Sequence, residues 1–222
     1  PNNLKKIQAQ TYRDFKLTNR YSSDLLDKVR IELTKSEKIR SYKCLKILHI
    51  TNFNERFNGR LHYNTGKRIN NGLIRLGHNV YQLSDRDVIS SNRSILNPSS
   101  KKTLNKKIIE ICENFKPNLV ILGHADSVKL ETLKYLKNKN KNLKISQWFL
   151  DPLSKFGPDH ENNKKRVINK IDIIDNTFLT TNPNSLSFKL KNSFFMPNPC
   201  DQAFEILSNY KRKCNYDVFF AM

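Results

Sequence analysis

A histidine and two aspartates follow apolar segments of the chain and could carry out proton transfer or bind hydroxyl groups. His124 and Asp126 come directly after the run NLVILG, and Asp151 comes directly after ISQWFL. A histidine exchanges a proton near neutral pH, and a carboxylate can serve as a base. The alternatives are a His124 ring that only bonds to backbone, and an Asp151 that caps a helix or pairs with a nearby arginine. We take His124, Asp126 and Asp151 as the candidate catalytic residues.

A polar loop after the first apolar run is a candidate anion-binding site. The loop TNFNERFNGR leads into a predicted helix, whose unpaired N–H groups would attract a phosphate. Its arginines would add positive charge, and Gly59 would let the backbone approach a ligand closely. A loop that only connects a strand to a helix is the alternative. The candidate substrate-binding residues are Asn52, Asn54, Arg56, Asn58, Gly59 and Arg60, together with Asn182 after a later apolar run.

Strands that alternate with helices must position these residues. Six strands are predicted at 45–50, 78–84, 118–123, 143–150, 177–181 and 194–197, and the intervening helices at 60–76, 101–115, 127–139, 160–171 and 184–191. The apolar runs lack a two-residue alternation, which is typical of strands buried on both faces. We therefore predict an α/β fold with a Rossmann-like, doubly wound parallel sheet over residues 44–199. Such sheets bind ligands at the carboxyl ends of their strands.

Two further segments flank this predicted domain. Residues 1–43 have the pattern of a basic helical segment, which could pack on the domain or lie on an anionic membrane surface. Residues 200–222 are expected to form a linker helix at about 201–211 and a strand at 216–220. That strand would be the first of a second, truncated domain. The chain starts with Pro1, so we also expect its natural start to be trimmed.

The composition narrows the possible partners and cofactors. The chain has 222 residues, with 40 basic and 20 acidic side chains and a net charge of +20. This charge favours polyanions, although the basic residues are spread along the chain as a compositional bias of the genome would spread them. The four cysteines have no paired spacing, so we expect neither a zinc site nor a disulfide framework.

Several standard motifs are missing from the sequence. It contains no P-loop, no G-x-G-x-x-G and no G-x-S-x-G, which argues against P-loop NTP hydrolysis, dinucleotide binding and serine hydrolase chemistry. We expect no metal and no cofactor. Motifs that recognise DNA or RNA are also missing, so no specific nucleic acid is expected. No apolar run reaches the length of a membrane span, and we expect a cytoplasmic protein that could contact the inner membrane peripherally.

Four segments, in this order, resemble the N-terminal domain of GT-B fold glycosyltransferases of the group-one type. They are KILHITNF, NNGLIRLGHNVYQLS, KPNLVILGHA and FFMPNPCDQAF. A fifth segment, ISQWFLDP, is similar to the spore-maturation-protein type of these enzymes. The chain departs from the usual pattern in the fourth segment, where Pro199 and Cys200 stand in place of Gly-Val.

The resemblance implies an enzyme that moves a sugar from a nucleotide-sugar donor to a glycan or lipid acceptor in bacterial surface polysaccharide synthesis. The second domain would bind the donor, so residues 1–222 alone would be inactive. Residues 52–60 would border the donor phosphates, and Asn198 would lie at the domain junction. His124, Asp126 and Asp151 would line the cleft; in an inverting enzyme, His124 or Asp126 would take the acceptor proton. The alternatives are a non-catalytic basic α/β module that binds nucleic acid or anionic membrane, and another two-domain enzyme such as a sugar-nucleotide epimerase.

Overall fold

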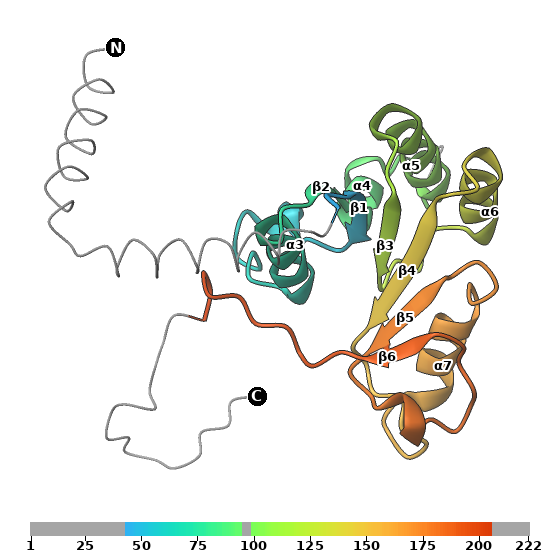
Figure 1. Cartoon of the computed structure of the whole chain (residues 1–222). Coiled ribbons are helices and arrows are strands. Elements are labelled where there is room, and N and C mark those ends of the chain that lie inside the picture. The colour runs from blue at the N-terminus through green and yellow to red at the C-terminus, as the bar shows by residue number, and fades with distance from the viewer. Residues whose placement is uncertain (1–42, 95–98, 206–222) are drawn as a thin grey trace, which may run out of the picture. The chain divides into compact units, whose positions relative to one another are not determined.

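A computed structural model describes residues 43–94 and 99–205, which contain one parallel sheet of six strands (Figure 1). The strands are β1 (Lys46–Thr51), β2 (Asn79–Ser84), β3 (Leu119–Gly123), β4 (Lys144–Phe149), β5 (Asn176–Leu179) and β6 (Ser193–Phe195). Their order in the sheet is β2-β1-β3-β4-β5-β6, and every neighbouring pair is parallel. The prediction of a Rossmann-like α/β fold with a parallel sheet is confirmed.

Helices and short 3-10 turns connect these strands. They are η2 (Glu55–Phe57), α3 (Thr65–Arg75), α4 (Asp85–Ser91), α5 (Lys101–Phe115), α6 (Leu130–Lys139), α7 (His160–Ile168) and η3 (Pro183–Ser185). The chain leaves β1 in one direction to form β2, and then returns past β1 to form β3 on its other side. The winding direction therefore reverses between β1 and β3, where a sheet of this kind leaves a crevice at the carboxyl ends of its strands.

Helices cover both faces of the sheet because its strands are apolar on both sides. Ile47 and Ile121 face α3, where they pack with Ile69 and Leu73. The residues of opposite parity, such as Leu48, pack with the apolar sides of α4, α5 and α6. Val167 of α7 packs on the last part of the sheet, against Phe149 and Leu179. This two-sided burial explains why the strands are continuous apolar runs.

The wall between β1, β3 and β4 is closely packed. A Cβ added to Gly123 would lie 2.0 Å from Cζ2 of Trp148, so only glycine fits beneath this indole. The indole Nε1 donates to Nε2 of the buried His49, at 3.1 Å, and Nδ1 of His49 lies 3.4 Å from Oδ1 of Asn70. Burial lowers the pKa of His49 to about 4. His49 is therefore a neutral core residue whose ring nitrogens are both occupied.

Two predicted helices need correction, and one helix was not predicted. The helix expected at 60–76 begins only at Thr65, because residues 58–63 form turns that include the left-handed Asn58 and Gly59. The segment 184–191, predicted to be helical, contains part of the short turn η3 and otherwise irregular chain with a bend at residues 187–188. In contrast, residues 85–91, for which no helix was predicted, form α4.

The described chain ends in a turn and not in a linker helix. Residues 202–204 form this turn, and the N–H groups of Phe204 and Glu205 both donate to the carbonyl oxygen of Asp201. The predicted helical segment 1–43 lies, apart from residue 43, outside the described residues. The remainder of the linker helix and the strand at 216–220 also lie outside them.

Candidate functional site

A small cavity of about 210 Å³ lies at the point where the winding of the sheet reverses. We call it the switch-point crevice. Its walls come from the ends of β1, β3 and β4, the start of α3, and α4. The lining residues are Thr51, Asn52, Asn64, Thr65, Gly66, Arg86, His124, Trp148 and Leu150. This is where a doubly wound sheet is expected to bind a ligand.

The start of α3 brings unpaired N–H groups to the crevice. Oδ1 of Asn64 accepts from the N–H of Lys67 at 3.0 Å, and its Nδ2 donates to the carbonyl oxygens of Phe53 and Leu61. Asn64 thus fixes both the helix start and the loop before it. A Cβ on Gly66 would lie 2.6 Å from Cγ2 of Thr51, so glycine lets the helix end approach β1. A helix start in this position favours an anion.

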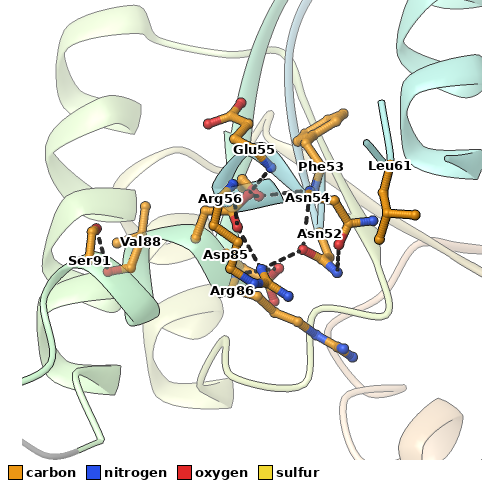
Figure 2. Close-up of polar contacts among 12 residues, drawn as sticks. Asn52, Phe53, Asn54, Glu55, Arg56, Leu61, Asp85, Arg86, Val88 and Ser91 are labelled. Atoms are coloured by element: carbon orange, nitrogen blue, oxygen red, sulfur yellow. Dashed lines mark hydrogen bonds and ion pairs between the residues drawn. The ribbon is translucent and has the colours of Figure 1, made fainter. Parts of the chain in front are cut away.

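Arg86 supplies a positive charge at the crevice. The guanidinium makes no hydrogen bond or ion pair among residues 43–94 and 99–205, and Figure 2 shows its side chain extending away from the neighbouring contacts. The backbone N–H of Arg86 donates to Oδ1 of Asp85 at 2.8 Å. Burial raises the pKa of Asp85 to about 6, and its carboxyl contacts the backbone of Arg86 and makes no ion pair with the guanidinium in the described structure. Arg86 is therefore available to a ligand.

The arginine predicted from the loop, Arg56, is instead paired. Its Nη1 lies 2.5 Å from Oδ1 of Asp87 and donates to Oδ1 of Asn52 at 3.2 Å (Figure 2). Burial acts to raise the pKa of Asp87, but hydrogen bonds from Ser84, from the N–H of Glu55 and from Arg56 hold it below its usual range. Asn52 also donates to Oδ1 of Asn54, at 2.7 Å. These contacts hold the loop in one conformation, and among the predicted loop residues only Asn52 lines the crevice.

The remaining predicted substrate-binding residues lie away from the crevice. Asn58, Gly59 and Arg60 are exposed in the turn after η2, and a Cβ on Gly59 would meet nothing within 4 Å. The glycine is explained by its positive φ of 88° and not by a close approach of backbone to a ligand. Asn182 is exposed at the end of β5, where its side chain accepts from the N–H of Asn184. Asn198 is exposed after β6.

The three candidate catalytic residues lie together around an arginine that was not predicted from the sequence. Arg166 of α7 donates from Nε and Nη2 to the two carboxylate oxygens of Asp126, at 3.1 and 2.8 Å. Its Nη1 donates to Oδ2 of Asp151 at 2.9 Å, and its Nη2 lies 3.0 Å from Nδ1 of His124. We call these four residues the Arg166 cluster. Of the alternatives open for Asp151, the pairing with an arginine is the one observed.

His124 is held in its neutral form. The N–H of Leu150 donates to its Nε2 at 3.1 Å, and Nδ1 faces Nη2 of Arg166, a donor, at 3.0 Å, so a donor lies against each ring nitrogen; Nδ1 also lies 3.5 Å from Oδ2 of Asp151. The ring stacks on Phe149, with 4.4 Å between centroids. Burial lowers the pKa of His124, and the positive charge of Arg166 adds to this effect while Asp151 opposes it. A base must accept a proton on a free lone pair, so this geometry favours a positioning role for His124 over proton abstraction.

A buried lysine supports the turn that carries His124 and Asp126. Lys170 is 7% exposed and donates from Nζ to the carbonyl oxygen of Ala125 at 2.8 Å. Burial lowers its pKa, although the charges of Asp126 and Asp85 act in the opposite direction. His124 itself has a left-handed backbone, with φ of 48°. Lys170 therefore stabilises a strained turn that places His124 at the edge of the crevice.

The segment FFMPNPCDQAF is attached to α3. The buried carboxylate of Asp201 accepts from Nη2 of Arg75 at 2.7 Å and from Nδ2 of Asn71 at 2.8 Å. The Arg75 guanidinium and the other donors hold the pKa of Asp201 well below its usual range. Glu205 pairs with Arg68, and Phe204 meets the edge of His62 with 5.7 Å between ring centroids. The chain after β6 is thus fixed to the helix whose first turn lines the crevice.

Comparisons with known proteins identify no relative: no protein-family model matches the sequence, and no curated protein is significantly similar to it. Within the part of the chain that the structure describes, no group of three or more His, Cys, Asp or Glu side chains could hold a metal ion. Among the helices of that part, none has the length and apolarity that crossing a membrane requires.

Proposed function

We propose that residues 44–199 form the acceptor-side domain of a GT-B glycosyltransferase, which transfers a sugar from a nucleotide-sugar donor to a glycan or lipid acceptor. The observation that carries the proposal is the switch-point crevice. It combines hydroxyl groups of Thr51 and Thr65, the amide of Asn52, the helix start at Gly66 and the guanidinium of Arg86. Hydroxyl and amide groups suit a sugar, and a helix start beside a cation suits a phosphate.

The size of the crevice supports a two-sided site. Its volume of about 210 Å³ is below the range of about 300 to 1,000 Å³ that is usual for pockets that enclose a ligand. It can therefore hold one sugar ring or one phosphate group and cover one side of a larger substrate. A GT-B site has this form, because the substrates bind between two domains.

The attachment of residues 201–205 to α3 is a second support. In the resemblance, this segment is the junction between the domains, and here Asp201 fixes it to the helix that begins at the crevice. The Arg166 cluster then orients the acceptor side, and we assign His124 the task of holding the Leu150 backbone and Asp151 in position. If the enzyme inverts, proton abstraction falls to Asp126, because its carboxylate is 46% exposed and keeps lone pairs that Arg166 does not use.

Saturation-transfer NMR on the 222-residue chain tests this function with methyl glycosides and nucleotide-diphosphate sugars as probes. We expect saturation of the sugar protons, and about tenfold weaker binding for Thr65→Val and Arg86→Gln, each of which removes a polar contact at the crevice. Arg60→Gln is the control, because Arg60 lies away from the crevice. If no sugar receives saturation while generic DNA binds with a steep salt dependence, the basic binding module is the better assignment.

A further inference from the structure

A second cavity, of about 530 Å³, lies beside the crevice and is lined by basic residues and serines. We call it the cation pocket. Its lining comes from η2, from α4 and the start of α5 with the described residues Arg93 and Ser99 next to them, and from Ser127 before α6. The residues that line it are Arg56, Arg86, Ile89, Ser90, Arg93, Ser99, Lys101 and Ser127. Since Arg86 lines both cavities, the cation pocket and the crevice are neighbours.

The charges of the cation pocket are not compensated by its own walls. Arg56 is neutralised by its ion pair with Asp87. Arg86, Arg93 and Lys101 make no side-chain hydrogen bond or ion pair among the residues that the structure describes, and no acidic residue lines the pocket. The buried Asp85 accepts from the backbone N–H of Arg86 and makes no ion pair with its guanidinium in the described structure. Three positive charges on exposed residues therefore face one cavity, and their combined positive potential attracts anions.

Other cavities of the molecule show that this arrangement is not a simple result of the net charge. The cavity next to α7 has two lysines, Lys155 and Lys164, but also two acids, Asp159 and Glu161. The cavity beside β2 has Arg56 and Lys107 together with Glu55 and Asp87. A chain that scatters basic residues evenly would produce mixed linings of this kind.

The local structure directs these cations to the same place. Arg86 and Ser90 are four residues apart, a spacing that puts both side chains on one face of α4, and Arg93 follows two residues after the last residue of this helix. Lys101 is the first residue of α5, which has 15 residues, and its helix start adds positive potential. The hydroxyl groups of Ser90, Ser99 and Ser127 can donate to phosphate oxygens.

We propose that the cation pocket binds a phosphate or diphosphate group of the acceptor. The identification of the bound molecule as the acceptor rests on the proposed function. The assignment of an anion site depends only on the residues that line the pocket. Because Arg86 joins the two cavities, a sugar in the crevice and a phosphate in the cation pocket belong to one molecule. The substrate class is then a phosphorylated sugar, either soluble or linked through its phosphate to a lipid.

Isothermal titration of the 222-residue chain with glucose 1-phosphate tests the site, and phosphatidylcholine vesicles with a polyisoprenyl phosphate test the lipid-linked source. The test variant is Arg93→Gln/Lys101→Gln, in which both residues line only the cation pocket. The control variant is Lys102→Gln/Lys165→Gln, which loses the same charge from exposed positions outside it. We expect about tenfold weaker phosphate binding for the test variant and less than about twofold for the control.

The outcomes separate this inference from the proposed function. Binding of the soluble probe alone assigns a soluble acceptor, and binding to the vesicles alone assigns a lipid-linked one. Equal losses in the two variants, or no binding of either probe by the parent chain, would overturn the cation pocket. A neutral methyl glycoside reports on the crevice separately, and its binding should be unchanged in Arg93→Gln/Lys101→Gln.

Discussion

The Arg166 cluster and the cation pocket lie near the same carboxyl edge of the sheet. They differ in whether their charged side chains are paired within the protein. In the Arg166 cluster one guanidinium serves Asp126, Asp151 and the edge of His124, so each charge has a partner within the protein. In the cation pocket Arg86, Arg93 and Lys101 have no such partner in the described structure. Paired groups position the backbone and each other. Unpaired groups are left for a ligand.

This difference between paired and unpaired charges depends first on the protonation state of Asp85, whose carboxyl accepts from the backbone N–H of Arg86. Burial raises its pKa from 3.8 to about 6, so the folded protein holds a proton that the unfolded chain releases. The stabilising effect of that proton is complete below pH 3.8 and is lost as the pH rises through 6. At pH 7 the buried charge costs up to about 3 kcal/mol. An uncharged residue would avoid this cost.

We therefore predict that Asp85→Asn raises the free energy of unfolding at pH 7 by about 1–3 kcal/mol, because the amide oxygen can still accept from the Arg86 N–H. Urea unfolding at several pH values checks this, and the gain should shrink toward pH 4. His49, whose lowered pKa makes the protein lose stability as the pH falls below 6.5, is present in both chains and cancels. The exposed Asp172→Asn is the control. A gain that does not change with pH would refute the burial argument.

The second prediction concerns the Arg166 cluster. Arg166→Met leaves Asp126 and Asp151 without their shared cation, and it should lower the free energy of unfolding by about 1–3 kcal/mol. Lys165→Met, at the exposed neighbouring position of α7, removes the same charge and should change stability by less than about 0.5 kcal/mol. Urea unfolding at pH 7 compares the two.

NMR titration of His124 sharpens the same test. Since Arg166 lowers the pKa of His124 and Asp151 raises it, the pKa should rise in Arg166→Met and remain as it is in Lys165→Met. Unchanged values in both variants would mean that the Arg166 cluster is a surface contact with little energetic effect.

The strands could be predicted because burial on both faces gives them continuous apolar sequences. Three residues of the Arg166 cluster could be predicted with them. Runs such as LVILG are apolar at every position, and the residues that follow them are carried to the carboxyl edge of the sheet. His124, Asp126 and Asp151 were found in this way. Arg166 was not, because a basic residue on a polar helix carries no sign of the carboxylates it will meet.

The helix α4, which lines the cation pocket, was not predicted from the sequence for a different reason. The sequence SDRDVISS is short and polar, so its pattern did not predict a helix, although Val88 and Ile89 anchor it as α4 in the core. Conversely, LSFKLK was expected to be helical, but its apolar residues Leu186, Phe188 and Leu190 alternate. This alternation does not fit a helix, and in the irregular chain that forms instead all three side chains pack against the core cluster of Phe149.

The substitution with the smallest expected effect is at Gly59, in the loop that was predicted from the sequence to bind an anion. Its φ of 88° is open to asparagine, and a Cβ there meets nothing within 4 Å, so Gly59→Asn should cost about 1 kcal/mol or less. Binding of glucose 1-phosphate and of methyl glycosides should be unchanged. The matched substitution is Gly66→Ala at the start of α3, where the new Cβ would lie 2.6 Å from Cγ2 of Thr51. This contact should displace the helix start from the crevice and weaken glycoside binding by several-fold, as isothermal titration would measure. If Gly59→Asn weakened binding and Gly66→Ala did not, the binding site would lie in the loop 52–60, and the assignment of the crevice would fail.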